Sequence, residues 1–166
     1  RSRGLGDVYK RQFIECSQEY LLDGDESSRP VGETIFVRNI SLEAKKQPDK
    51  AQICGIVGHA DLLSENVSSI LEKHLEEGQG LFKGIRHAGG WDHHDEIDNS
   101  HHHPQKNLYL SDEFSEGLNE LENNDLSFEA WQYHHQIKQV TLLAKEHPNL
   151  KIVCLLYTSD AADECS

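Results

Sequence analysis

Three apolar segments of this chain, each with the composition of a buried β-strand, are followed within three residues by a histidine. They are residues 53–58 before His59, 82–85 before His87 and 126–131 before His134. The segments between them show the 3.6-residue apolar period of amphipathic helices. Because polar groups at the carboxyl ends of parallel strands build the active sites of α/β enzymes, this arrangement favours an enzyme of that class.

Strands and helices alternate along the rest of the chain as well. Predicted strands cover residues 13–16, 53–57, 81–85, 126–131 and 151–154, and predicted helices cover 33–46 and 64–78 and begin near Asp112 and Ile137. No hairpin signal joins two strands, which predicts a parallel sheet with right-handed crossovers. About five strands are too few for a closed (β/α)8 barrel, so the predicted fold is α/β, a partial TIM barrel. Residues 89–110, which are polar and lack periodicity, are predicted to form a loop.

The two ends of the chain do not look like its middle. Residues 2–12 and 155–164 resemble translated sequencing-adapter sequence, of the kind that flanks open reading frames assembled from environmental DNA. We therefore interpret 1–12 and 155–166 as non-native flanks and 13–154 as the domain.

Composition excludes several classes of function. The net charge of −13 argues against a nucleic-acid partner or an anionic membrane surface. No apolar run reaches the roughly 18 residues of a membrane span, and no signal peptide is evident, so we expect a cytoplasmic protein. Three of the four cysteines lie in apolar strand-like runs without C-x-x-C spacing, which predicts buried free thiols. Nucleotide-binding glycine motifs are absent, which argues against a nucleotide-binding protein of this class. The G-x-S-x-G motif is also absent, which argues against a nucleophilic serine. We expect a small-molecule substrate.

Arg86 and His87 end one predicted strand and are the strongest candidates for catalysis. An arginine at the end of a buried strand is costly unless it meets an anion, which can be a substrate carboxylate or a developing oxyanion. An internal salt bridge with Asp61 or Asp92 would explain the same residue equally well. His59 and Asp61 follow another strand, where they could orient water or hold a substrate hydroxyl, or only satisfy loop backbone groups.

A further polar group follows the strand at 126–131. Tyr133, His134, His135 and Gln136 all carry hydrogen-bonding side chains. If the backbone stays extended, only alternate residues point to one side, so Tyr133 with His135 competes with His134 and Gln136 for a pocket. Spacing alone leaves this choice open.

Five more histidines lie in the predicted loop, at positions 93, 94, 101, 102 and 103. Their spacing matches no zinc motif. We therefore predict a solvated His-rich loop that binds transition metals only adventitiously, and no dedicated metal site in this segment.

Five motifs occur in a characteristic order. They are F-I-E-C at 13–16, R-P-V-G-E-T-I-F-V-R at 29–38, G-I-V-G-H-A-D-L at 55–62, F-K-G-I-R-H at 82–87 with Trp91 and Asp92, and L-S-F-E-A-W at 126–131 with Tyr133, His134 and Gln136. Together they resemble the amidohydrolase-related family of TIM-barrel proteins, described as metal-dependent hydrolases and including lactonases. The resemblance covers residues 13–154.

This resemblance implies that strands two to five and the start of strand six of an eight-stranded barrel are present. The family's His-x-His pair, its strand-six histidine and its late aspartate base have no counterpart in this sequence. A divalent metal such as zinc is thus implied for the full-length protein and no cofactor for this segment. Carried over by motif, the catalytic residues are Arg86, His87 and His59. The substrate-binding residues are Asp61, Trp91, Tyr133, His134 and Gln136.

Our main interpretation is a segment of a hydrolase that cleaves an anionic lactone or another cyclic ester. An aspartate outside the segment would activate water, while an arginine or histidine at a strand end polarises the carbonyl. The segment alone is expected to be inactive and, with unpaired strand edges, poorly soluble. Two alternatives stay open: a His-rich metal-binding module, and a truncated reading frame without function.

Overall fold

The structure is a computed structural model that describes residues 10–47, 50–94, 96–97 and 104–156. Two compact units make up the chain: residues up to 60 together with 68–84, and residues 61–67 together with 85 onward. The outer parts of both predicted flanks, the histidines at 101–103 and Cys165 lie outside the described residues.

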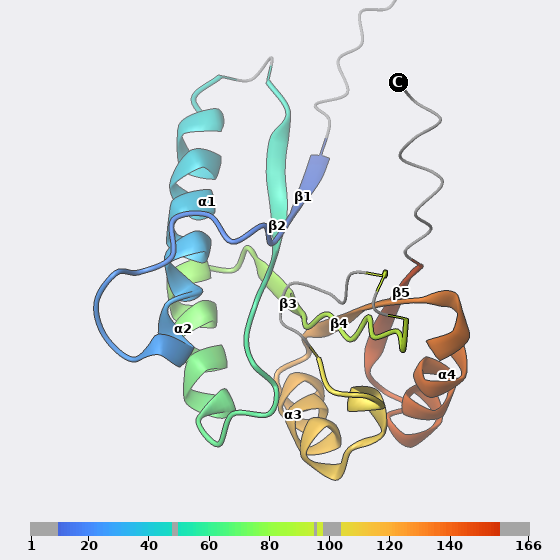
Figure 1. Ribbon diagram of the computed structural model, residues 1–166. Helices are drawn as coiled ribbons and strands as arrows, with labels where there is room; N and C mark the ends of the chain where they lie inside the picture. Colours follow the sequence, from blue (N-terminus) through green and yellow to red (C-terminus); the bar gives the residue numbers. More distant parts are fainter. Residues whose placement is uncertain (1–9, 48–49, 95, 98–103, 157–166) are drawn as a thin grey trace, which may run out of the picture. The chain divides into compact units, whose positions relative to one another are not determined.

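Strands alternate with helices throughout the described residues. The strands are β1 (Lys10–Ile14), β2 (Gln52–Gly58), β3 (Phe82–Arg86), β4 (Ser127–Gln132) and β5 (Lys151–Leu156), and the helices are α1 (Val31–Ala44), α2 (Val67–Gly78), α3 (Asp112–Asn123) and α4 (Ile137–Glu146) (Figure 1). Short 3-10 turns are η1 (Glu26–Ser28), η2 (Leu108–Leu110) and η3 (His134–Gln136). The sheet order is β1-β2-β3-β4-β5. This confirms the predicted α/β class, with five parallel strands alternating with helices as in part of a (β/α)8 barrel.

The first and last strands extend past the predicted domain limits. Lys10 pairs with Gln52 at the start of β1, and Gln132 pairs with Leu156 at the end of β5. Both pairings are parallel, and they include residues 10–12 and 155–156 of the adapter-like flanks. Ladder hydrogen bonds use backbone groups only, so they continue through residues that belong to a flank by sequence.

In the first unit, α1 packs against β2. Val37 of α1 is buried, as are Ile56 and Val57 of β2. The Ser41 hydroxyl donates a hydrogen bond of 3.0 Å to the carbonyl of Ile53. These contacts fix the carboxyl-terminal half of α1 beside the start of β2, as required when a helix covers a parallel strand.

His74 of α2 is a buried histidine of the same unit. Its Nε2 lies 3.1 Å from the carbonyl oxygen of His59, and its Nδ1 lies 2.8 Å from the Thr34 hydroxyl. A carbonyl only accepts, so Nε2 carries the proton and Nδ1 accepts from Thr34. Its ring also stacks on Phe82 with centroids 4.6 Å apart. Burial lowers the pKa of His74 from 6.5 to about 4.

We expect His74 to make the protein less stable in mild acid. Its pKa is lower in the folded state than in the unfolded state, so the unfolded chain binds the extra proton between these values. The stabilisation is complete above the unfolded pKa and is lost as the pH falls toward the folded pKa, by about 2 kcal/mol between roughly pH 7 and pH 5. Urea titrations across this range should show a flatter profile for His74→Gln, whereas an unchanged slope would assign the effect to other groups.

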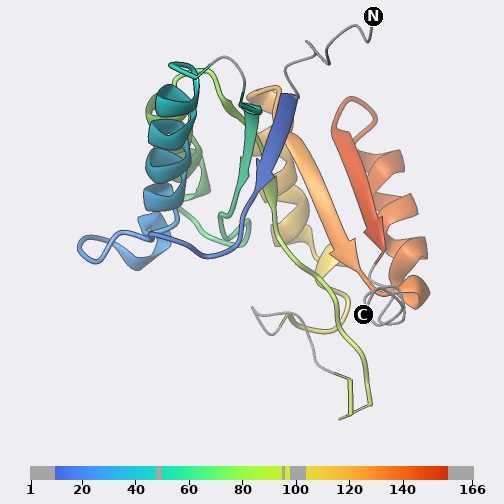
Figure 2. The ribbon, with the colours of Figure 1, turned by 90° about the horizontal axis from the view of Figure 1, so that it is seen from above.

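In the second unit, three aromatic rings form the centre of the core. The Phe114 centroid lies 5.2 Å from that of Tyr109 and 5.6 Å from that of Phe128, and all three residues are buried. The Ser111 side chain accepts a hydrogen bond from the Phe114 N–H and so caps α3, which begins at Asp112 as predicted from the sequence. Strands β4 and β5 lie side by side, with α4 next to β5 (Figure 2).

Two predictions about burial were wrong. Leu108 and Tyr109 lie in the segment predicted as a solvated loop, yet both are buried in η2. Cys16, Cys54 and Cys154 were predicted to be buried thiols, yet all three are exposed. An apolar run predicts burial on both strand faces, but the first half of β2 is half-buried or exposed and only residues 55–58 are covered. In the part of the chain that is described, no helix has the length and apolar character needed to cross a bilayer.

Candidate functional site

Arg86, the last residue of β3, is bound by a carboxylate of β4. Its Nη2 lies 3.2 Å from Glu129 Oε2, and the two side chains are 21% and 4% exposed. Because a buried carboxylate is costly without a cation, Glu129 fixes the guanidinium at this strand end. The internal salt bridge considered for Arg86 therefore exists, with Glu129 as the partner in place of Asp61 or Asp92. The Arg86 side chain is half-buried at this strand end, 21% exposed, and is not fully covered by Glu129.

His87 lies next to Arg86 but contacts a different set of residues. Its ring meets Phe114 edge-on, with centroids 5.3 Å apart. Its Nδ1 accepts a hydrogen bond of 3.2 Å from the Leu62 N–H and lies 3.9 Å from a carboxylate oxygen of Asp61. Neighbouring residues of a strand face opposite sides, which separates His87 from the Arg86–Glu129 pair. His87 thus supports the backbone at 61–62, and its catalytic role stays a prediction.

Gln136, a predicted substrate-binding residue, forms hydrogen bonds to the loop after β3. Its Oε1 accepts hydrogen bonds from the N–H groups of Trp91 and Tyr133, at 3.1 and 3.2 Å. Its Nε2 donates to the Gly89 carbonyl at 2.8 Å, and the residue is 2% exposed. One amide therefore satisfies three backbone groups from two distant segments. Both ends of the Gln136 amide are occupied by backbone groups, so the structure gives it a supporting role for the loop. Substrate binding by Gln136 stays a prediction.

Tyr109 supports the same loop from its other side. Its hydroxyl lies 3.0 Å from the His87 carbonyl and 3.1 Å from the Trp131 carbonyl. Burial raises the pKa of Tyr109, which stays a neutral donor. A Cβ at Gly89 would overlap the Tyr109 ring, and one at Gly90 would overlap the Trp131 ring. Close packing against two aromatic rings therefore requires glycine at both positions.

The turn after β4 resolves the choice between Tyr133 with His135 and His134 with Gln136. Tyr133 and Gln136 are buried, whereas His134 and His135 are exposed. Neither predicted pairing is correct, because residues 134–136 form the 3-10 turn η3 and residues three apart share a side.

The remaining predicted residues lie at different depths. Trp91 is half-buried, and Lys106 Nζ lies 5.4 Å from its ring centroid. The Asp61 side chain is 54% exposed and accepts a hydrogen bond of 3.0 Å from the Leu63 N–H. His59 belongs to the first unit, where it is 8% exposed and its carbonyl contacts His74. The roles predicted for these residues and for Tyr133 and His134 stay predictions.

Sequence reasoning did not single out Glu129 or Tyr109. Glu129 is the one acidic residue in an apolar strand segment, and a buried carboxylate needs a cation nearby, so its pairing with an arginine was open to prediction. For Tyr109 the available signal was the apolar triplet Leu108-Tyr109-Leu110 at the end of an otherwise polar segment.

One group of described side chains has the geometry to hold a metal ion. The ligand atoms of Asp92, His93 and His94 all lie within 4.8 Å of one another. Imidazole nitrogen and carboxylate oxygen are ligands that zinc accepts.

Comparisons with known proteins give limited similarity. No family model matches the chain. It is 27% identical over 150 residues to the uncharacterized protein y4mH of Sinorhizobium fredii, which covers 90% of this chain and 46% of that protein. The chain thus spans less than half the length of this relative. A crystal structure of an amidohydrolase from Burkholderia multivorans with bound HEPES aligns with a TM-score of 0.49 and 19% identity, over 72% of this chain and 35% of that one.

Proposed function

We propose that this chain forms the substrate-binding part of a longer hydrolase that opens an anionic lactone or another cyclic ester. The observation that carries the proposal is Arg86, a half-buried arginine held at the end of a parallel strand by a buried carboxylate. In parallel α/β enzymes, substrates bind at the carboxyl ends of the strands. The ordered motifs that resemble amidohydrolase-related proteins support the reaction class.

In the proposed reaction, a water oxygen attacks the lactone carbonyl carbon, and a carboxylate base outside this chain takes the water proton. The carbonyl electron pair moves onto oxygen, and Arg86 donates hydrogen bonds either to this oxyanion or to a carboxylate elsewhere on the substrate. The oxyanion electron pair then re-forms the carbonyl as the ring C–O bond breaks, and the departing alkoxide takes the proton back from the base. The product is a hydroxy acid, which releases its carboxylic proton to solvent and leaves as the carboxylate.

Glu129 acts as a positioning residue in this scheme. A long arginine side chain loses substantial rotamer freedom when it binds substrate, and the 3.2 Å contact with Glu129 restricts that freedom beforehand. Gln136 and Tyr109 play a comparable part for the backbone of the loop after β3. The family's His-x-His pair is not in this sequence, so the proposal assigns this chain substrate binding and no metal-dependent step.

The test uses the full-length gene product and two matched substrates, a lactone that carries a carboxylate and the methyl ester of the same lactone. Arg86→Lys keeps a cation for Glu129 but loses the planar fork that binds carboxylate. We expect kcat/KM for the charged lactone to fall at least tenfold in this variant. A larger loss for the charged lactone indicates carboxylate binding, and an equal loss in kcat for both indicates carbonyl polarisation.

Two further variants keep the test decisive. Arg86→Ala combined with Glu129→Gln removes both charges together and should fold while losing the same activity. Arg38→Lys is the matched control, because Arg38 pairs with Glu77 at 2.7 Å in the first unit. If the folded Arg86 variants hydrolyse both lactones as the unaltered enzyme does, or if that enzyme opens no lactone, the proposal is wrong.

A further inference from the structure

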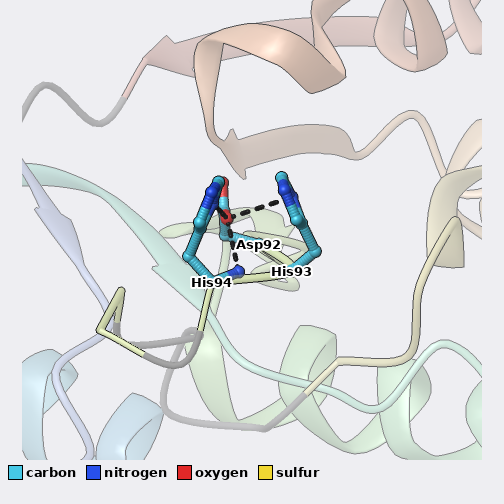
Figure 3. Close-up of side chains that lie close together, drawn as sticks. All are labelled: Asp92, His93 and His94. Atoms are coloured by element: carbon cyan, nitrogen blue, oxygen red, sulfur yellow. Dashed lines mark hydrogen bonds and ion pairs between the residues drawn. The ribbon is translucent and has the colours of Figure 1, made fainter.

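Asp92 is the centre of a group of histidines that the proposed hydrolytic reaction does not use. Its side chain is only 9% exposed. One carboxylate oxygen, Oδ1, lies 2.8 Å from His94 Nδ1 and 3.4 Å from His93 Nδ1. The same oxygen accepts a hydrogen bond of 2.9 Å from the His94 N–H. Figure 3 shows both rings turned toward this carboxylate.

A third imidazole reaches the other carboxylate oxygen from a distant part of the sequence. His135 in η3 places its Nδ1 3.6 Å from Asp92 Oδ2. Its Nε2 lies 3.1 Å from the carbonyl oxygen of Trp91, which can only accept, so Nε2 carries the proton. Histidines that bind metals commonly donate their second ring N–H to a backbone carbonyl in this way.

The three side chains converge closely enough to share one divalent ion. The ligand atoms of Asp92, His93 and His94 all lie within 4.8 Å of one another, and the ring centroids of His93 and His94 are 3.7 Å apart. His135 Nδ1 lies 3.6 Å from the second carboxylate oxygen, at the edge of this group.

The distances agree with the size of such an ion. Ligands at about 2.0–2.1 Å from a tetrahedral zinc ion are roughly 3.3 Å apart, close to the 3.4 Å between His93 Nδ1 and Asp92 Oδ1. The 2.8 Å between His94 Nδ1 and the same oxygen is a hydrogen bond, which the ion would replace. The rings of His93 and His94 are 68% and 62% exposed, which leaves an entry path for the ion.

We propose that Asp92, His93 and His94 form a binding site for a divalent transition metal ion, with zinc as the best match. Imidazole nitrogen and carboxylate oxygen ligands suit zinc, copper or nickel, whereas magnesium and calcium prefer sites made of oxygen atoms. His135 of η3 lies beside the second oxygen of the same carboxylate, so the ion would bind next to the turn after β4.

Calorimetric titration of the chelator-treated protein with zinc chloride tests this site. We expect one zinc ion per chain, an affinity at least tenfold weaker in Asp92→Asn and in His93→Gln, and no competition from excess magnesium. Cobalt in place of zinc should give the intense visible absorption of a tetrahedral site. Thermal unfolding with and without zinc adds a second readout, because an ion that binds only the folded state raises the melting temperature.

Two control variants separate this site from adventitious binding to histidine. His134→Gln changes the exposed neighbour of His135 in the same turn and should leave zinc affinity unchanged. Replacing the histidines at 101–103 by alanine should also retain one tightly bound ion. The proposal is overturned if zinc binding is lost in this triple variant, or if Asp92→Asn and His93→Gln bind zinc as tightly as His134→Gln. Since binding is measured without substrate, the result is independent of lactone hydrolysis.

Discussion

Glu129→Ala is expected to lower the free energy of unfolding by about 4 kcal/mol, because it leaves the Arg86 cation without its carboxylate. Glu129 is 4% exposed and its oxygen lies 3.2 Å from Arg86 Nη2. Removing one partner of a buried ion pair strands the other charge in a medium that solvates it poorly. Urea unfolding followed by circular dichroism measures the change.

A double-mutant cycle separates the stranded charge from the lost packing. Arg86→Met combined with Glu129→Met removes both charges and keeps side-chain volume, so the double variant should be more stable than Glu129→Ala alone. The single variants of the cycle are Arg86→Met and Glu129→Met. If their effects on the free energy of unfolding simply add up in the double variant, the ion pair contributes no coupling energy, contrary to the geometry described above.

Gly117→Ala is expected to destabilise the protein by about 3 kcal/mol, although alanine is the better helix former by roughly 1 kcal/mol. Gly117 lies in α3, where an added Cβ would overlap the backbone carbonyl oxygen of Leu62. A backbone atom cannot rotate away as a side chain can, so α3 or the 61–67 segment must shift.

Asn119→Ala is the matched control for this substitution. Asn119 is exposed in the same helix, so the alanine there gains helix propensity without a clash. The two variants should therefore change the melting temperature in opposite directions. If the Gly117→Ala variant were as stable as the Asn119→Ala variant, the backbone of Leu62 could not lie as close to α3 as described.

The alternation of strands and helices could be predicted from the sequence because each element has a local apolar period. The segment 82–87 shows both the success and its limit. Its apolar residues predict β3, and its terminal Arg86 predicts a bound anion. The anion in the structure is Glu129, more than forty residues away, and no local pattern reports that distance.

The turn after β4 and the His-rich loop show why the site was predicted only in part. In an extended backbone at 133–136, successive side chains would point to opposite sides. The 3-10 turn η3 has three residues per turn instead, so Tyr133 and Gln136 share a side and are both buried. Spacing among the loop histidines matches no zinc motif, yet His93 and His94 both lie close to the Asp92 carboxylate, and η3 places His135 beside its second oxygen.

What the sequence by itself determined was the order of elements, the α/β class and the positions where polar groups end apolar strands, because these depend on neighbours a few residues apart. Only the tertiary structure decided which charges pair and which side chains share a site. Pairing of β3 with β4 and docking of η3 bring together residues distant along the chain. Electrostatic and hydrogen-bond energies depend on those distances in space, which is why Arg86, Glu129, Asp92 and His135 acquire their partners only in the fold.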